Sequence, residues 1–105
     1  MPDISVIHTS VASEADASQL ADELIRRRLA ACVQITGPGR SFYRWQGEVT
    51  HEEEWHLTIK TTTAASLQTR TWLETHHPYE VPEIIWSTCQ GTIAYANWAG
   101  DVVEQ

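Results

Sequence analysis

Hydrophobic and polar positions recur with two different periods in the first third of the chain. Residues 3–9, DISVIHT, are short and rich in β-branched side chains, which predicts a strand. A capping-box spacing at residues 13–16 is followed by apolar residues at helical intervals, so a helix is expected over residues 16–29. The arginines at 26–28 suit its C-terminal end, where the helix dipole favours cations.

The middle of the chain predicts a long β-hairpin. The run AACVQI resumes as a strand, breaks at Gly37-Pro38-Gly39 and continues through SFYRW. Gln46-Gly47 then offers a two-residue turn. In the returning strand, odd residues from Trp55 to Ile59 are apolar and even residues from Glu54 to Lys60 are polar, so one face of this strand is expected to be buried.

The rest of the chain predicts a second helix, a fourth strand and a short terminal helix. The threonines at 61–63 offer an N-cap for a helix over 64–76. Residues 81–90 form the expected strand, with Pro82 near its first position, and TIAYANWAG predicts a helix that stops at Gly100. The order β-α-β-β-α-β plus a terminal helix indicates an α+β, ferredoxin-like sandwich, and the length predicts one domain over residues 1–105.

This topology also predicts the state of the two cysteines. Strands two and four lie at opposite edges of a ferredoxin-like sheet, so Cys32 and Cys89 are expected to be too far apart for a disulfide. Reduced thiols and the absence of a signal-peptide pattern at the N-terminus predict a cytoplasmic protein.

Charge and composition narrow the class of partner. The net charge of -7 argues against nucleic-acid binding, which needs a basic surface, and no apolar run approaches the ~20 residues of a membrane span.

The number of tryptophans and the length of the hairpin indicate a subunit interface. Five tryptophans are many for 105 residues, so some are expected in such an interface. The predicted hairpin is about twice as long as the first strand, and its far half would be marginal alone in water. We therefore expect another subunit to cover Phe42, Tyr43 and Trp45.

The ordered segments LAACVQI, SFYRWQGEV, EEEWHLTIKTT, HHPYEVPEI and YANW resemble the CutA divalent-cation tolerance family. The resemblance implies a ferredoxin-like homotrimer in which the long hairpins pair across subunits. It also implies a part in tolerance of copper and other divalent cations. The overall shape is similar to that of trimeric PII signalling proteins, which bind small ligands between subunits.

The resemblance further implies a copper site made of a strand-one cysteine and the two histidines before PY. His76 and His77 match these histidines, but Thr9 occupies the cysteine position and is a poor ligand for a soft metal. His77 precedes Pro78, so its backbone should be extended and the two rings should point apart. We expect weak divalent-cation binding, or purely structural roles in which His76 complements the helix C-terminus and His77 is a polar linker.

Other polar residues suggest alternative sites. If Lys60, Tyr79 and Glu83 line a cavity between subunits, they could hold a small polar or anionic ligand, as in a PII-like module. An enzyme that uses Lys60, Glu83 and a histidine is disfavoured because the spacing identifies no nucleophile–base pair. The run of glutamates at 52–54, flanked by His51 and His56, is typical of a solvated hairpin surface.

Overall fold

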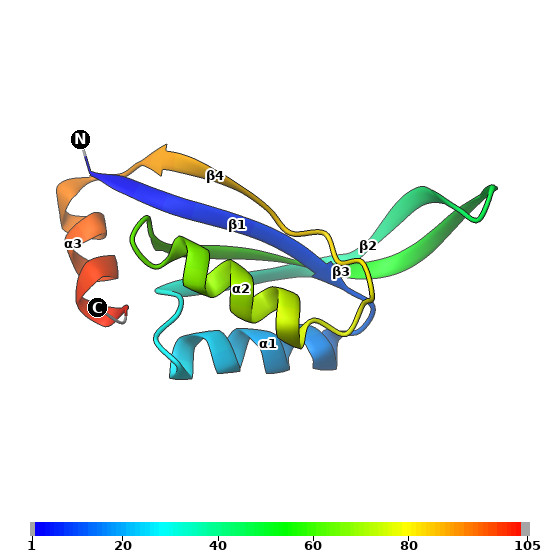
Figure 1. The fold of residues 1–105 in the computed structure, drawn as a ribbon, viewed down its shortest axis with the longest axis horizontal. Coiled ribbons are helices and arrows are strands. Elements are labelled where there is room, and N and C mark those ends of the chain that lie inside the picture. The colour runs from blue at the N-terminus through cyan, green and yellow to red at the C-terminus, as the bar shows by residue number, and fades with distance from the viewer. Residues whose placement is uncertain (1, 104–105) are drawn as a thin grey trace.

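The computed structural model describes residues 2–103 and confirms the predicted α+β order. The four strands form an antiparallel sheet in the order β2-β3-β1-β4 (Figure 1). The elements are β1 (Asp3–Val11), α1 (Glu14–Arg26), β2 (Cys32–Trp45), β3 (Glu48–Thr62), α2 (Ser66–His76), β4 (Ile85–Gln90) and α3 (Ile93–Val102). The sheet order places β2 and β4 at opposite edges, as predicted, and Cys32 and Cys89 are free thiols.

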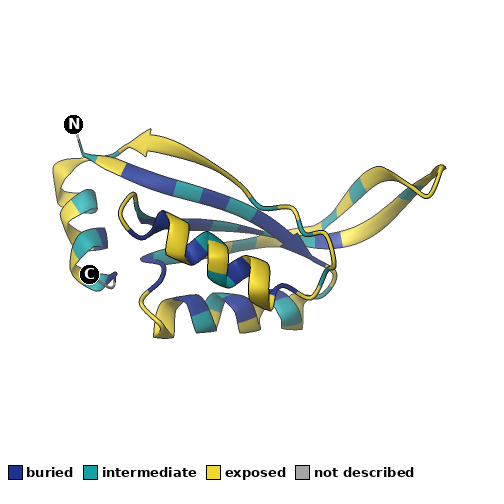
Figure 2. Cartoon of the chain, viewed as in Figure 1, coloured by how far each residue is buried: buried dark blue, intermediate teal, exposed yellow. Residues whose placement is uncertain are grey.

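The core lies between the sheet and two helices. Helices α1 and α2 run antiparallel on one face of the sheet, and α3 lies at its end beside the start of β1 (Figure 1). The dark-blue stripes of Figure 2 follow the sheet and the facing sides of α1 and α2. The larger buried side chains of this core are Ile7, Val11, Leu20, Leu24, Leu29, Leu57, Ile59 and Leu73. A second buried cluster joins α3 to the sheet through Ile4, Ala65, Ala99 and Val103.

Local signals account for the position of α1. The Ser13 hydroxyl oxygen accepts a hydrogen bond from the backbone N–H of Asp16 at 3.1 Å, which satisfies one of the free donors of the first turn. The helix ends where Arg28 adopts a left-handed conformation with φ of 57°. The helix therefore begins two residues earlier and ends three residues earlier than predicted, while it buries the expected apolar stripe.

Other predicted boundaries also differ from the structure. Strand β2 does not break at Gly37-Pro38-Gly39, because a register shift between Thr36 and Gly39 absorbs these residues as a bulge. Strand β4 begins at Ile85 rather than at residue 81, so Pro82 lies in the α2–β4 connection. Helix α3 continues through Gly100 to Val102.

The β2–β3 hairpin extends well beyond its neighbour, as predicted. Pairing of β1 with β3 stops at Val11 and Trp55, whereas β2 and β3 stay paired out to Trp45 and Glu48 (Figure 1). The turn residues Gln46 and Gly47 have φ of 50° and 81°, the left-handed values that a type I′ hairpin turn requires. The projecting half is exposed in the single chain (Figure 2).

Candidate functional site

His77 is a buried histidine with both ring nitrogens engaged. Its Nδ1 accepts a hydrogen bond from the backbone N–H of Tyr79 at 3.0 Å, so Nδ1 carries the lone pair. The proton must then sit on Nε2, which donates to the Ser10 carbonyl oxygen at 2.9 Å. Burial lowers the pKa of His77, which favours the neutral ring that this pattern needs. His77 therefore has no free nitrogen for a metal ion while these two bonds persist.

His76 is exposed and has the opposite arrangement. Its Nδ1 lies 2.9 Å from the Trp72 carbonyl oxygen, which can only accept, so Nδ1 carries the proton. In the neutral ring the lone pair is then on Nε2. A backbone carbonyl that fixes the tautomer in this way is the usual support of a metal-binding histidine. Stacking on Trp72, with centroids 4.4 Å apart and planes at 16°, further holds the ring.

The two neighbouring histidines thus point into different surroundings. His77 has an extended backbone, with φ of -69° and ψ of 138°, which agrees with the restriction that Pro78 imposes. His76 ends α2 on the outside, while His77 turns towards the end of β1. The local geometry makes His76 the more available ligand of the pair.

A buried carboxylate, Glu54, ties the α2–β4 connection to the sheet. Its Oε2 accepts from the Tyr79 hydroxyl at 2.8 Å and from the Ser10 hydroxyl at 3.3 Å, and the residue is only 9% exposed. Burial, together with the hydrogen bond to Glu54, raises the pKa of Tyr79. The expectation that Glu54 is part of a solvated charge run was wrong, because the connection folds Tyr79 over it. No signal in the sequence pairs these residues, which are 25 positions apart.

The other proposed ligand-binding residues lie apart in the single chain. Lys60 donates to the Gln34 side-chain oxygen at 2.7 Å on the sheet face opposite α1 and α2. Lys60 lies six positions after Glu54, the partner of Tyr79, along β3, which is about 20 Å of extended chain. Glu83 is exposed in the α2–β4 connection. A ligand that touches all of them would need a contribution from a second copy.

The position that the resemblance assigns to a cysteine is part of the core. Thr9 is 1% exposed, and its hydroxyl oxygen has no hydrogen-bond partner among residues 2–103. Within the same residues, no three His, Cys, Asp or Glu side chains are placed to share one metal ion. None of the described helices is long and apolar enough to cross a membrane.

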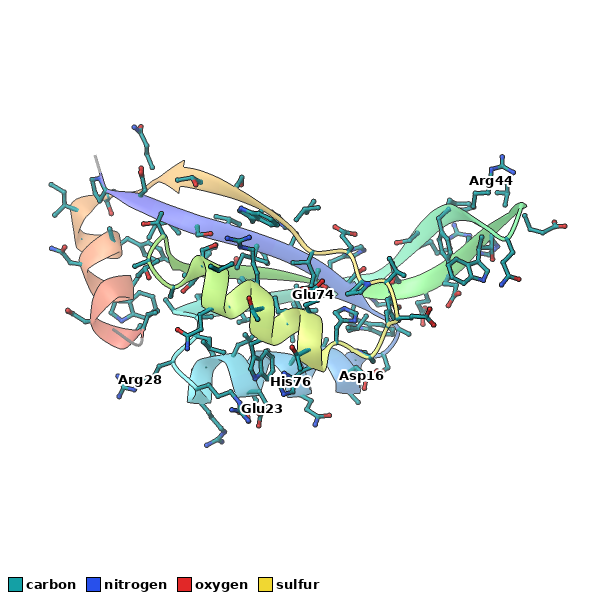
Figure 3. All side chains as sticks on the ribbon, in the orientation of Figure 1. Asp16, Glu23, Arg28, Arg44, Glu74 and His76 are labelled. Atoms are coloured by element: carbon teal, nitrogen blue, oxygen red, sulfur yellow. The ribbon has the colours of Figure 1, made fainter. Side chains whose placement is uncertain are left out.

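A cleft between α1 and α2 contains the exposed histidine. The volume of the cleft is about 320 Å³, and Figure 3 labels three of its lining residues, Asp16 and Glu23 on α1 and His76 at the end of α2. The full lining is Asp16, Gln19, Leu20, Glu23, Trp72, His76 and Pro78. The antiparallel helices place the end of α2 beside the start of α1, so His76 and Asp16 share one end of the cleft. No sequence pattern predicts this cleft, because the spacing of residues does not show which helix faces meet.

The hairpin residues predicted for an interface are exposed in the single chain. Phe42 is 65% exposed and Trp45 57% exposed, while the Tyr43 hydroxyl donates to Glu52 Oε1 at 2.6 Å. A second exposed apolar surface lies along the groove between α2 and β4, where Leu67, Val81 and Trp86 are 66%, 77% and 52% exposed. The hairpin and the α2–β4 groove are therefore separate uncovered apolar surfaces of the described chain.

Comparison with known proteins relates this architecture to one family. The family described as CutA1 divalent ion tolerance protein matches residues 5–102. The divalent-cation tolerance protein CutA of Thermus thermophilus is 42% identical over 94 residues, which cover 89% of this chain and 91% of that protein. The CutA structure from Synechococcus elongatus has a TM-score of 0.93 at 36% identity, covering 99% of this chain and 93% of that one. The CutA1 structure from Ehrlichia chaffeensis has a TM-score of 0.94 at 25% identity and covers 100% and 99% of the two chains. The chain belongs to the CutA1 divalent ion tolerance family.

Proposed function

We propose that this chain is a cytoplasmic homotrimer that contributes to divalent-cation tolerance through weak, reversible cation binding, and that it has no catalytic role. The observation that carries the proposal is the His76 ring, whose Nδ1–H is held by the Trp72 carbonyl and whose Nε2 lone pair is free. Relatives of this chain are named divalent-cation tolerance proteins, which supports a cation as the ligand.

The assembly follows from surfaces that the single chain leaves uncovered. The hairpin presents Phe42 and Trp45, and the α2–β4 groove presents Leu67 and Trp86, all more than half exposed. Burying apolar area of this kind stabilises an association by roughly 25 cal/mol per Å² removed from water. A head-to-tail contact between two different surfaces of identical chains closes into a ring when the rotation allows. A ring of three agrees with the homotrimer that the family resemblance implies.

The chemistry of His76 indicates which cations the protein would prefer. Imidazole nitrogen suits copper, zinc and nickel, and affinity for a given nitrogen site generally peaks at Cu²⁺ in the divalent series. One imidazole, without a thiolate at the position of Thr9, gives weak binding. We expect a dissociation constant on the order of micromolar or poorer, about -8 kcal/mol or less favourable.

Calorimetric titration of the protein with copper, zinc and nickel tests this assignment. The variants are His76→Ala, His77→Gln and, as a matched control on the exposed hairpin, His51→Ala. His76→Ala should abolish the strongest heat of binding, whereas His51→Ala should leave it unchanged. If His77→Gln retains its fold, as judged by circular dichroism, it should also retain binding. Copper binding that survives His76→Ala intact would refute the role of His76.

A second candidate function is a PII-like module that binds a small polar ligand between subunits through Lys60, Tyr79 and Glu83. It is favoured by Lys60, which lies half-buried on the sheet face that α1 and α2 leave open. If a second copy packs there, Lys60 would stand at the subunit boundary. Lys60→Met should then abolish binding of an anionic ligand and leave copper binding at His76 intact.

A further inference from the structure

We propose that the cleft between α1 and α2 binds a linear aliphatic polyamine, with ammonium groups at Asp16 and Glu23 and the methylene chain along Leu20 and Trp72. This ligand is different from the divalent cation considered above. The proposal rests on the linear order of charged and apolar groups along the cleft, which matches the order of groups in such an amine.

The α1 side of the cleft has a regular spacing. Asp16, Leu20 and Glu23 are residues i, i+4 and i+7 of one helix, so all three lie on one stripe and line the cleft. A rise of 1.5 Å per residue separates the two acidic positions by about 10 Å along the helix axis. An apolar side chain thus lies between two carboxylates. This is the arrangement that two ammonium groups joined by a hydrocarbon chain would meet.

The opposite wall adds an aromatic surface and an acceptor. Trp72 and His76 both line the cleft from α2, and their rings stack on each other, with His76 at the end where α2 stops. The His76 Nε2 lone pair can accept a hydrogen bond from an ammonium group, and the indole gives a methylene chain apolar contact. The wall therefore complements both parts of a polyamine.

The separation of Asp16, Glu23 and His76 suits an extended ligand better than one metal ion shared by all three side chains. The described residues hold no three potential metal ligands close enough to share one ion, and Asp16, Glu23 and His76 are part of that set. A metal ion would have to draw all of them to within about 2.0–2.2 Å of its centre. A flexible chain can instead satisfy each carboxylate where it stands.

An existing ion pair has to be exchanged at one end of the cleft. Glu23 accepts from Arg27 Nε at 2.7 Å, and both side chains are well exposed at 39% and 53%. Exposed i,i+4 pairs of this kind contribute little to stability, so an ammonium group can replace the guanidinium at small cost. The Arg27 guanidinium also lies 5.6 Å from the centre of the Trp72 ring, which shows that a cation is accommodated beside this indole.

The test is titration of the metal-free protein with spermidine at low, constant ionic strength. Binding is followed by calorimetry and by the NMR signal of the Trp72 indole N–H, assigned with Trp72→Phe. This N–H reports on the cleft because Trp72 lines it and the nitrogen has no hydrogen-bond partner among the described residues. The variants are Asp16→Asn and Glu23→Gln. The control is Asp22→Asn, which removes the same charge from α1 outside the cleft.

We expect Asp16→Asn and Glu23→Gln each to weaken spermidine binding at least threefold, and Asp22→Asn to leave it within experimental error. Spermidine should shift the Trp72 indole signal in the wild type. An equal loss of affinity in all three variants would overturn the proposal, because spermidine would then be an unspecific counterion of an acidic protein. An unshifted indole signal or absence of binding would overturn it as well. The unfolding midpoint of each variant is compared with that of the wild type. Midpoints that agree exclude misfolding as the cause of any loss of spermidine affinity.

Discussion

At the residue scale, His76 and His77 show how backbone partners assign different chemistry to identical side chains. A carbonyl acceptor at Nδ1 leaves the Nε2 lone pair of His76 free, whereas an N–H donor at Nδ1 commits His77 to two internal bonds. The sequence predicted the extended backbone of His77, because Pro78 restricts it locally. It could not predict the bond to Ser10, which depends on where the end of β1 lies 67 residues away in the chain.

The buried neutral state of His77 predicts a pH dependence of stability. Because burial lowers the native pKa, the unfolded chain takes up the proton first as pH falls below about 6.5. The free energy of unfolding should then fall from pH 6.5 down to the native pKa and change no further from this cause below it. Urea unfolding at fixed protein concentration should show a steeper loss between pH 7.5 and 5.5 in the wild type than in His77→Gln. If the free energy of unfolding falls equally steeply with pH in both proteins, His77 is not the source of the pH dependence.

Two tyrosines provide a matched test of the buried carboxylate. Tyr79→Phe removes the hydroxyl that donates to buried Glu54, whereas Tyr43→Phe removes one that donates to exposed Glu52. Leaving a buried charged acceptor short of a donor costs about 1–3 kcal/mol, so Tyr79→Phe should lower the free energy of unfolding by about that amount. Tyr43→Phe should change it by less than about 0.5 kcal/mol. If both changes lower the free energy of unfolding in denaturant equally, the Tyr79 hydroxyl is not needed to stabilise buried Glu54.

At the level of the elements, the hairpin shows that glycine and proline in the sequence do not by themselves predict where a strand ends. Gly37-Pro38-Gly39 has the composition of a chain break, yet β2 continues through it because the long β3 strand supplies pairing partners on both sides of a bulge. The Gln46-Gly47 turn was predictable, since a two-residue turn is a local feature. Long-range pairing decides the first case, and local backbone preference decides the second.

The bulge itself can be tested by substitution of its glycines. A Cβ on Gly37 would lie 2.9 Å from Trp55 Cδ1 and 3.1 Å from the Glu54 carbonyl oxygen, at a φ of 156° that side chains rarely adopt. Gly37→Ala should therefore cost more than about 1 kcal/mol of unfolding free energy. Gly39→Ala is the control, because its Cβ would meet only the His56 ring, at 3.4 Å. If Gly39→Ala lowers the thermal unfolding midpoint more than Gly37→Ala does, this explanation of the bulge is wrong.

At the scale of the whole molecule, the sequence predicted the order of elements and the sheet edges, because strand and helix periods are local and the ferredoxin-like connections then fix the strand order. It did not reveal the cleft between α1 and α2, which depends on how two helix faces meet. The described chain is elongated, with extents of 46 × 25 × 22 Å, because the hairpin projects from the sheet (Figure 1). A projecting two-stranded ribbon with exposed aromatic residues is marginal in isolation, so we expect the stability of the hairpin to depend on assembly.

Light scattering coupled to size-exclusion chromatography at micromolar concentration tests that dependence most directly. We expect a mass three times the 11.9 kDa of one chain, and dissociation when Phe42 and Trp45 are both replaced by serine. Each of these side chains contributes about 1.5–3 kcal/mol on full burial, so their joint loss should shift the midpoint of assembly to higher concentration. The wild-type protein running as a stable monomer at micromolar concentration would contradict the central claim.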